Sequence, residues 1–490
     1  MSGGKMVIIG REKEQDIIGT CMQSHRPEFI VVYGRRRVGK TYLIKEYFNN
    51  RFSFYATGVT DEKMKGQLQS FNDSLKIYGQ KNKKAPSDWF EAFSRLRELL
   101  EKSDIQRDAM TGKRVVFLDE VPWMDTPKSG FKSALDYFWN SWASSHPDIV
   151  LIVCGSATSW ITDNIFRSKR GFYNRITRKI QIKPFNLGET ERLFRTNGIS
   201  ISRSQLVEAY MIFGGIPYYL NLFDRRLSLA QNVEELLFKE GGELYYEYEY
   251  LFSSLFKNPE KYLAIIKAIS EKKCGILRKE LAADKAIGDG EPLTKVLRQL
   301  EECAFIRKYK NFGKDKQSFI FQLVDPFTLF CMEFAVERKI KSWLKFIGSP
   351  AYYNWRGYAF EILCLNHADQ IKAKLGIAGI ESMEYSWIGG TPDDKVQIDM
   401  LIDRKDDVIN VCEIKDTDKE FEINAEYEKK IKSRMAVFRN ATKTEKTLIA
   451  TMISANGLKQ NAYSGIIQNL ITATDLFGTL YTASGIHGMN

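Results

Sequence analysis

Short apolar runs in the N-terminal third of the chain alternate with segments of helical spacing. Phe29–Tyr33, Val115–Leu118 and Ile149–Val153 are rich in β-branched or aromatic residues and have the length of buried strands. Thr41–Phe48 follows the first run closely, and its apolar residues recur at helical spacing. Strands that are apolar throughout belong to sheets buried on both faces. The pattern therefore predicts an α/β fold with a parallel sheet at its core.

The residues between the first strand and its helix form a phosphate-binding pattern, GxxxxGK[ST]. Gly34 and Gly39 allow the backbone to fold around phosphate, and the N–H groups at the helix start point at the anion. Lys40 is expected to reach the β and γ phosphates, and Thr41 to ligate Mg²⁺. The sequence thus predicts an ATP site whose loop comprises Gly34, Arg35, Arg36, Arg37, Val38, Gly39, Lys40 and Thr41.

Acidic and small polar residues follow the other two strands. Asp119, at the end of the second strand, can hold Mg²⁺ through water, and Glu120 is placed to polarise an attacking water as general base. Asp-Glu after an apolar run is a weak signal alone, but the loop upstream makes it an indication of ATP hydrolysis. Ser156, after the third strand, is either a sensor of the γ phosphate or the N-cap of the next helix.

Two arginines further along have two interpretations. Arg175 and Arg178 could supply an arginine finger to their own site or to that of a neighbouring subunit in a homo-oligomer. The alternative is a basic cluster on the surface.

The middle of the chain changes from helices to a basic hairpin. Residues 186 to about 232 have the pattern of helices. Three further helices are predicted near 262–269, 278–286 and 293–300, and two strands at 305–309 and 318–321. Three helices and a basic hairpin resemble a winged helix. That resemblance implies DNA contacts for Thr294, Lys295 and Arg298 in a groove and for Lys314 and Lys316 on phosphate. The alternative is a winged helix that only packs between domains.

A second hairpin is predicted near the C-terminus. Lys395–Ile402 and Val408–Lys415 alternate in part and are joined by a charged turn. If the loop has an odd number of residues, Asp399 lies opposite Glu413 on one face. An even loop would set Asp399 against Cys412 and separate the two acids.

Converging carboxylates would bind a hard divalent cation through oxygen, and a lysine beside them could deprotonate a water that attacks a phosphodiester. Lys415 shares a face with Glu413, and Glu361 on an upstream helix is a further candidate ligand. The set Glu361, Asp399, Glu413-x-Lys415 is similar to the PD-(D/E)xK nucleases, which have the restriction-endonuclease-like fold. Short acid patterns of this kind also arise on exposed strand faces.

The composition of the chain indicates which partners, membrane segments and metal sites to expect. The net charge of +11 and the pI of about 9.0 favour an acidic partner such as DNA. No run of about 18 apolar residues predicts a membrane span, and the start lacks a signal peptide. Seven scattered cysteines without a CxxC pair, and only four histidines, argue against a structural zinc site and indicate reduced thiols in a cytoplasmic protein.

The ordered motifs GREKE, GRRRVGKT, VVFLDE, CGSATS, NRITRKIQIKPF and GGIPYYL resemble the AAA-related P-loop ATPases of archaea and bacteria. The resemblance implies that the turn with Gly10 and Arg11 lies near the adenine and that Pro184-Phe185 opens a helical lid. The domains expected are an ATPase core at 1–185, a lid at 186–250, a winged helix at 251–345 and a nuclease-like domain at 346–490. Asn174 departs from the family pattern, which has Gly before Arg175.

The leading hypothesis is an ATPase that uses ATP and Mg²⁺ to control DNA binding, with metal-dependent DNA cleavage as an extension. A second hypothesis is a nucleotide-controlled regulator whose nuclease-like domain is inactive and binds a protein or DNA. In a third, the C-terminal domain serves only oligomer contacts.

Overall fold

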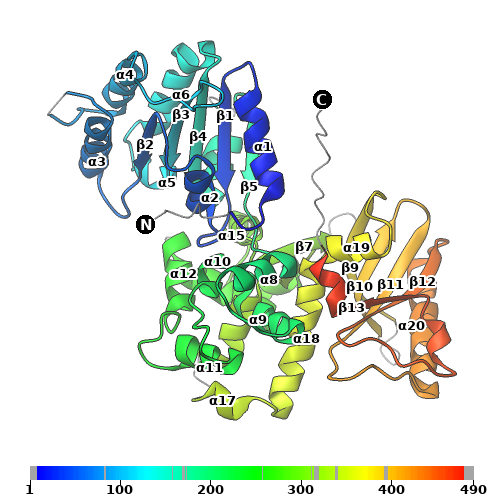
Figure 1. The fold of residues 1–490 in the computed structure, drawn as a ribbon. Coiled ribbons are helices and arrows are strands. Elements are labelled where there is room, and N and C mark those ends of the chain that lie inside the picture. The colour runs from blue at the N-terminus through cyan, green and yellow to red at the C-terminus, as the bar shows by residue number, and fades with distance from the viewer. Residues whose placement is uncertain are drawn as a thin grey trace, which may run out of the picture. The chain divides into compact units, whose positions relative to one another are not determined.

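The computed structural model describes residues 8–81, 84–156, 158–167, 172, 174–256, 258–310, 312–313, 319–336, 340–390 and 396–478. The chain divides into two compact units, Met1–Lys183 and Pro184–Asn490. Each unit is built around its own β-sheet structure (Figure 1). Lys314, Lys316 and Lys395, which the sequence assigns to a wing and a strand, lie outside the described residues.

Unit 1 contains a parallel sheet of five strands in the order β2-β3-β4-β1-β5. The strands are β1 (Glu28–Tyr33), β2 (Phe54–Thr57), β3 (Arg114–Asp119), β4 (Ile149–Gly155) and β5 (Arg178–Gln181). The three predicted strands are the central ones, and they are buried along nearly their whole length. The prediction of an α/β fold with a parallel core is confirmed.

Helices cover both faces of this sheet (Figure 1). They are α1 (Glu12–Gln23), α2 (Lys40–Tyr47), α3 (Met64–Ile77), α4 (Trp89–Leu100), the short α5 (Val121–Met124), α6 (Phe131–Ser141) and α7 (Thr158–Ile161). Alternate strand residues such as Val31 and Leu151 pack with α3, α4 and α6 in one large core. Aromatic rings fill it; Trp89, for example, meets Phe131 edge to face.

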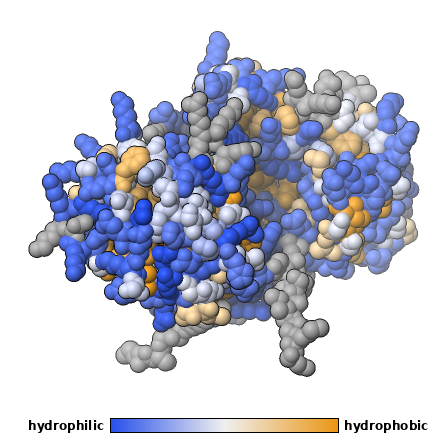
Figure 2. All heavy atoms as spheres, turned by 90° about the horizontal axis from the view of Figure 1, so that it is seen from above, coloured by the Kyte–Doolittle hydropathy of each residue, from blue (hydrophilic) through white to orange (hydrophobic). Residues whose placement is uncertain are grey.

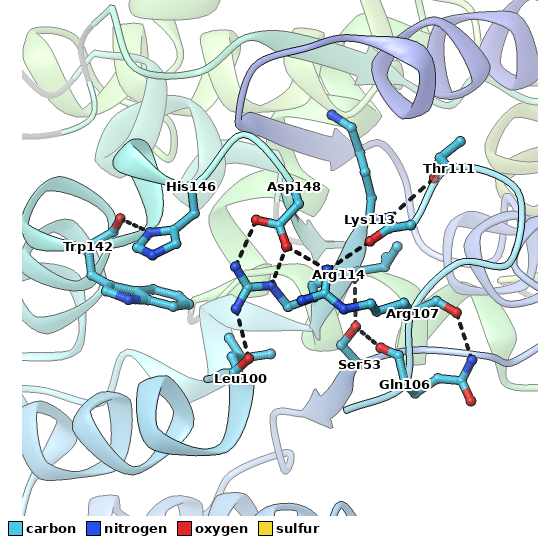
Figure 3. Close-up of polar contacts among 12 residues, drawn as sticks. Ser53, Leu100, Gln106, Arg107, Thr111, Lys113, Arg114, Trp142, His146 and Asp148 are labelled. Carbon is cyan, nitrogen blue, oxygen red and sulfur yellow. Dashed lines mark hydrogen bonds and ion pairs between the residues drawn. The ribbon is translucent and has the colours of Figure 1, made fainter. Parts of the chain in front are cut away.

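The amino edge of the sheet is closed by paired charges (Figure 3). The buried Arg114 donates two hydrogen bonds to Asp148, from Nε and Nη2, each 2.7 Å long. Its Nη1 donates to the carbonyl oxygen of Leu100 at 2.7 Å. Burial alone would raise the pKa of Asp148, but Arg114 and Arg107 outweigh it and lower that pKa. Asp148 and the two arginines thus link the start of β3 to the start of β4.

Unit 2 begins with helices. They are α8 (Leu187–Thr196), α9 (Arg203–Phe213), α10 (Pro217–Leu220), α11 (Leu229–Val233) and α12 (Glu247–Leu255). Asn186 and Glu189 form a capping box that fixes the start of α8. Gly214 and Gly215, both with positive φ, end α9. A Cβ on Gly215 would lie 2.2 Å from the carbonyl oxygen of Phe185, so this break requires glycine.

Three helices and a small sheet follow. They are α13 (Pro259–Ser270), β6 (Ile276–Leu277), α14 (Arg278–Ala283), α15 (Glu291–Glu302), β7 (Ile306–Lys310) and β8 (Phe319–Leu323). The strands pair antiparallel in the order β6-β8-β7. The predicted helices and strands lie where the sequence puts them, and β6 was not expected.

The rest of unit 2 holds a mixed sheet in the order β13-β12-β11-β10-β9. Its elements are α16 (Pro326–Phe330), α17 (Trp343–Phe346), α18 (Pro350–Asn366), α19 (Ala368–Lys374), β9 (Ser382–Gly389), β10 (Val396–Arg404), β11 (Val408–Lys415), α20 (Ala425–Thr442), β12 (Thr447–Ser454) and β13 (Asn469–Thr472). Strands β9, β10 and β11 are antiparallel, whereas β11, β12 and β13 are parallel. Helix α18 packs on β11 and α20 on β10.

A buried histidine joins the first helices of unit 2 to its last third. His367 is 0% exposed, and its Nε2 accepts the backbone N–H of Leu187 at 3.0 Å. Its Nδ1 lies 2.9 Å from the carbonyl oxygen of Leu363, so Nδ1 carries the proton. Burial lowers the pKa of His367 to about 4. The segments that the sequence divides into lid, middle and C-terminal domains therefore form one compact unit.

Hydrophilic side chains cover most of the face in Figure 2, with small hydrophobic areas between them. Within the described part of the chain, no helix combines the length and the apolar character needed to cross a membrane.

Candidate nucleotide site and acid cluster

The loop between β1 and α2 requires glycine at both ends. Gly34 has φ +147, and a Cβ there would lie 2.3 Å from the carbonyl oxygen of Ile182. Gly39 has φ +89 and caps α2 in the left-handed conformation. Glycine adopts both of these backbone conformations with little steric strain, because it has no Cβ. The loop therefore presents the amino end of α2, where N–H groups lack partners within the helix, to the edge of the sheet.

The two residues that begin α2 are both tied to the site. The Nζ of Lys40 donates to the carbonyl oxygen of Arg35 at 2.9 Å and is almost fully buried. The Oγ1 of Thr41 donates to Oδ2 of Asp119 at 2.8 Å. The predicted partners Thr41 and Asp119 thus meet across the edge between α2 and β3. Their oxygens are the donors that Mg²⁺ prefers, so the residues fit that ion.

Asp119 and Glu120 end β3 in different environments. Burial, followed by the charge of Glu120, raises the pKa of Asp119. Glu120 adopts φ +48, an uncommon conformation for this residue type, and its backbone N–H donates to Oδ1 of Asp119 at 3.0 Å. This turn directs the two neighbouring carboxylates to different partners.

Ser156 follows β4, which lies between β1 and β3 in the sheet. Its Oγ donates to Oε1 of Glu120 at 2.5 Å, and its backbone N–H donates to Oε2 at 3.1 Å. The side chain of Ser156 therefore contacts the predicted general base. Both of these donors are neutral groups.

The turn before α1 reaches the same loop. Gly10 and Arg11 both have positive φ, and the buried Arg11 donates from Nη2 to the carbonyl oxygen of Val38 at 3.2 Å. Of the loop arginines, Arg35 is buried, Arg36 is exposed and Arg37 has φ +71. The contact of Arg11 with the loop is consistent with the place that the family resemblance implies for this turn.

Arg175 is paired with an acid of its own unit. Its Nη1 donates to Oδ1 of Asp136 on α6. Asn174, the residue before it, has φ +63, a conformation that glycine and asparagine tolerate best. The role of Arg175 as a finger stays a prediction, and such a role requires release from Asp136.

The predicted hairpin near the C-terminus has the register that brings its acids together. Met400 pairs with Cys412, so the next pair along sets Asp399 opposite Glu413. The connection 405–407 has an odd number of residues, which selects this alternative. The pairing of β10 with β9 shifts between Ile398 and Leu401. Asp399 therefore lies in an irregular stretch of strand, and such irregularities often re-aim a side chain.

Cations surround Glu413. Its Oε1 lies 2.9 Å from Nζ of Lys415 and accepts the hydroxyl of Tyr427, while its Oε2 accepts Nη1 of Arg434. Burial opposes ionisation of Glu413, but Lys415 and Arg434, with the hydrogen bond from Tyr427, outweigh it and lower its pKa. Tyr427 and Arg434 lie on α20 and are absent from the sequence prediction.

The other two acids have the opposite electrostatic environment. Burial and the charge of Glu413 raise the pKa of Asp399. Burial and the charge of Asp399 raise the pKa of Glu361 on α18. Within the described residues, no group of three or more His, Cys, Asp or Glu side chains has the spacing of a metal site. The three acids are neighbours, but they do not fit a cation as a set in this conformation.

Other features of both sites are missed by sequence reasoning. Gly58, after β2, lies against Glu120, because a Cβ there would be 2.4 Å from the carbonyl oxygen of Glu120. At the acid cluster, the charge of Lys273 acts on Glu361, and Tyr358 donates to the carbonyl oxygen of Lys273 at 3.1 Å. Strand β2 has only four residues, and Lys273 is distant in sequence, so neither leaves a local signal.

The residues predicted to contact DNA are partly exposed. Thr294 and Lys295 are exposed on α15, and Arg298 is half-buried near Glu302. Arg278 donates from Nη2 to Oγ1 of Thr294 at 3.2 Å. A nucleic-acid role for these residues stays a prediction.

Among solved structures, a Walker-type ATPase of Pyrococcus abyssi is 19% identical, with a TM-score of 0.46, over 67% of this chain and 96% of that one. The ORC2 protein of Aeropyrum pernix, in ADPNP–ADP complexes, is 12% identical, with a TM-score of 0.42, over 74% of this chain and 96% of that one.

Two relatives come from Methanocaldococcus jannaschii. An uncharacterised protein is 26% identical over 272 residues, 54% of this chain and 54% of the relative, so the chain spans about half of its length. An uncharacterised ATP-binding protein is 35% identical over 48 residues, 10% of this chain and 81% of the relative. Residues 8–223 match the family described as an ATPase domain predominantly from Archaea. This segment, which holds Lys40, Thr41 and Asp119, is similar to the P-loop ATPase domains of that family.

Proposed function

We propose that the chain hydrolyses ATP at the edge formed by β1, β3 and β4, and that its nucleotide state controls how unit 2 handles DNA. The hydrogen bond between Thr41 and Asp119 is the main support for ATP hydrolysis, because it joins the phosphate-binding loop to the acid at the end of β3. The neutral donors on Glu120 support it further, since they leave that carboxylate able to act as a base.

Each residue has a separate role in this proposal. Lys40 leaves the carbonyl oxygen of Arg35 to contact the β and γ phosphates, and the N–H groups at the start of α2 hold the same anion. Thr41 and Asp119 would hold Mg²⁺, which would supply positive charge to neutralise the phosphates. Glu120 orients and deprotonates the attacking water. Ser156, through its contact with Glu120, positions that base.

DNA binding is proposed for the three-helix segment. The order α13, β6, α14, α15, β7 and β8 supports the proposal of a winged helix. Exposed Thr294 and Lys295 on α15, and the net charge of +11, support contact with an acidic polymer. The same segment could instead serve only packing within unit 2.

DNA cleavage at the acid cluster is the finer candidate. Two helices, three antiparallel strands, a third helix and a parallel strand follow one another from α18 to β12. Asp399 lies opposite Glu413, and Lys415 lies beside Glu413. This order supports a PD-(D/E)xK-like fold. The alternative is a regulator that binds DNA or a protein without cutting, and the engagement of Glu413 by Arg434 favours it in this conformation.

The experiment is an ATPase assay of the full chain with Lys40→Ala beside the exposed control Lys65→Ala. Lys40→Ala should abolish ATP turnover, and Lys65→Ala should leave it unchanged. Turnover that survives Lys40→Ala would contradict the proposed site.

A gel-shift at several salt concentrations then tests DNA binding, because phosphate contacts give a steep loss of affinity with salt. Asp399→Ala should remove any nicking that depends on Mg²⁺ or Mn²⁺. Nicking that persists in this variant would exclude the acid cluster as its source.

A further inference from the structure

Glu120 and Ser156, which are hydrogen-bonded to each other, both lie beside very short helices. Glu120 directly precedes α5, Ser156 lies two residues before α7, and each of these helices has only four residues. A helix of this length is not stable by itself, because too few hydrogen bonds repay the cost of forming its first turn. The geometry of Glu120 and Ser156 therefore depends on contacts that α5 and α7 make with each other and with their neighbours.

The first of these contacts is a close approach of Gly155, the last residue of β4, to α5. A Cβ on Gly155 would lie 2.7 Å from Cδ of Pro122 in α5 and 3.3 Å from Cδ1 of Ile161 in α7. Glycine at this position therefore lets both short helices pack against the end of β4. This contact sets the two segments side by side, but it involves no directional bond.

A second contact joins the far ends of the two helices through a network of four side chains. Nε1 of Trp160, in α7, donates to Oδ2 of Asp125, the residue that ends α5, at 3.1 Å. Nζ of Lys132, in α6, lies 3.6 Å from the same oxygen and donates to Oδ1 of Asn164 at 2.8 Å. Asn164 donates from Nδ2 to the carbonyl oxygen of Trp160 at 3.0 Å. The network is closed, because each of its members contacts two others.

Asp125 is an expensive residue to place in this network. Its side chain is 14% exposed, and burial raises its pKa although Lys132 and the hydrogen bond from Trp160 oppose the rise. The ionised carboxylate therefore costs stability in its present surroundings. Titratable groups with this property gather at functional sites, which supports a role for Asp125 beyond packing.

We propose that Asp125 and Trp160 are positioning residues that keep Glu120 and Ser156 at hydrogen-bonding distance and so fix the direction of the base. The inference rests on the proposed role of Glu120 in ATP hydrolysis and deepens it. The bond between Glu120 and Ser156 joins the near ends of α5 and α7, and the bond between Asp125 and Trp160 joins their far ends. Loss of the second bond frees the two helices to move apart, and the first bond is then no longer maintained.

The test compares steady-state ATP turnover with the binding of a fluorescent ATP analogue, in the full chain. Trp160→Phe removes the N–H donor and keeps an aromatic ring, so it should lower kcat roughly 10- to 100-fold with KM and analogue affinity unchanged. Asp125→Ala should have the same effect. Asp125→Asn should retain most of the turnover, because its amide oxygen can still accept from Trp160.

The matched control is Trp139→Phe, which makes the same chemical change in the same hydrophobic core. Trp139 lies on α6 and packs on Phe29, so this variant should leave kcat unchanged even where it lowers the melting temperature. An equal loss of kcat in Trp139→Phe and Trp160→Phe would overturn the proposal, because general loosening of the core would explain both.

Double variants show whether the effect passes through Glu120. In a Glu120→Gln background, Trp160→Phe should hardly lower the residual turnover further, because the base that it positions is already absent. A further loss as large as that in the parent would overturn the proposal, as would weakened analogue binding that matches the loss of kcat. Unchanged kcat in Trp160→Phe, beside lost turnover in Glu120→Gln, would overturn it and leave the proposed function intact. Full turnover in Glu120→Gln would instead remove the proposed base, and the positioning role with it.

Discussion

The two sites place carboxylates at strand ends in contrasting ways. In unit 1, Glu120 accepts hydrogen bonds from the hydroxyl and backbone N–H of Ser156, both neutral donors. In unit 2, Glu413 is in contact with the cations Lys415 and Arg434. The first arrangement keeps the negative charge available for chemistry, and the second neutralises it. A motif identifies the residue types, whereas the partners decide whether the acid is ready to act.

The largest effect is expected from Glu120→Gln. Loss of a general base lowers turnover by roughly 10²- to 10⁴-fold, while ATP binding through Lys40 and Thr41 should persist. Steady-state hydrolysis and binding of a fluorescent ATP analogue measure the two separately. Stability should hardly change, because the amide oxygen can still accept from Ser156. The control is Glu98→Gln, which changes an exposed acid on α4. An equal loss of ATP turnover in both variants would refute a base role for Glu120.

A large pH effect is expected in unit 2, from His367 beside the acid-bearing α18. Its folded pKa of about 4 lies below the ordinary 6.5, so the buried ring favours the neutral form. The resulting stabilisation is fully present above pH 6.5 and is lost as the pH falls toward 4, a change of about 3 kcal/mol. Urea denaturation at several pH values should show this slope, reduced in His367→Gln. An unchanged slope in the variant would assign it to other groups.

Glu413→Gln should lower the free energy of unfolding by about 2 kcal/mol, because it leaves Lys415 and Arg434 partly buried without a charged partner. The pKa of Glu413 is lowered, so this stabilisation is present above its ordinary value of 4.5 and is lost as the pH falls below it. Denaturation of this variant beside Glu120→Gln compares the two sites directly. Equal stability changes would remove the contrast between them.

The smallest effect is expected from Asp399→Asn, in the opposite direction. The pKa of Asp399 is raised by burial and by Glu413, so its ionised form costs stability at neutral pH. Asparagine removes that cost and should raise the free energy of unfolding of the metal-free protein by about 1 kcal/mol. Such a gain is expected where an acid is kept for function at the expense of stability. A lower melting temperature in Asp399→Asn would show that the ionised carboxylate is compensated by a partner.

The sequence predicts those features that are local. Phe29–Tyr33 and Ile149–Val153 are continuous apolar runs, and the loop between Gly34 and Thr41 is contiguous, so strands and phosphate loop follow directly. Strand β2, with four residues, and β5, a charged edge strand, carry no such pattern and were missed. The sequence offered two hairpin registers, and the three-residue connection at 405–407 decided between them.

Contacts between distant segments explain the rest. Arg434 and Tyr427 are seven residues apart on one helix, and nothing in their neighbours marks them as partners of Glu413. Arg175 is unremarkable in sequence until α6 brings Asp136 to it. Such pairings depend on how helices pack on sheets, which a pattern along the chain does not encode.

The hydrogen bond from Leu187 to His367 bears on how this protein could be recombined. If residues 346–490 were removed, the first N–H of α8 would lose its hydrogen-bond acceptor, His367. Helices α9 and α16 would also lose their contacts with α18. Conversely, Gly188 would no longer meet the backbone of Phe477, to which a Cβ would come within 2.8 Å. The acid-bearing segment therefore depends on α8 and α9 for its packing, and gene fusions that keep it should break before Pro184 rather than near 346.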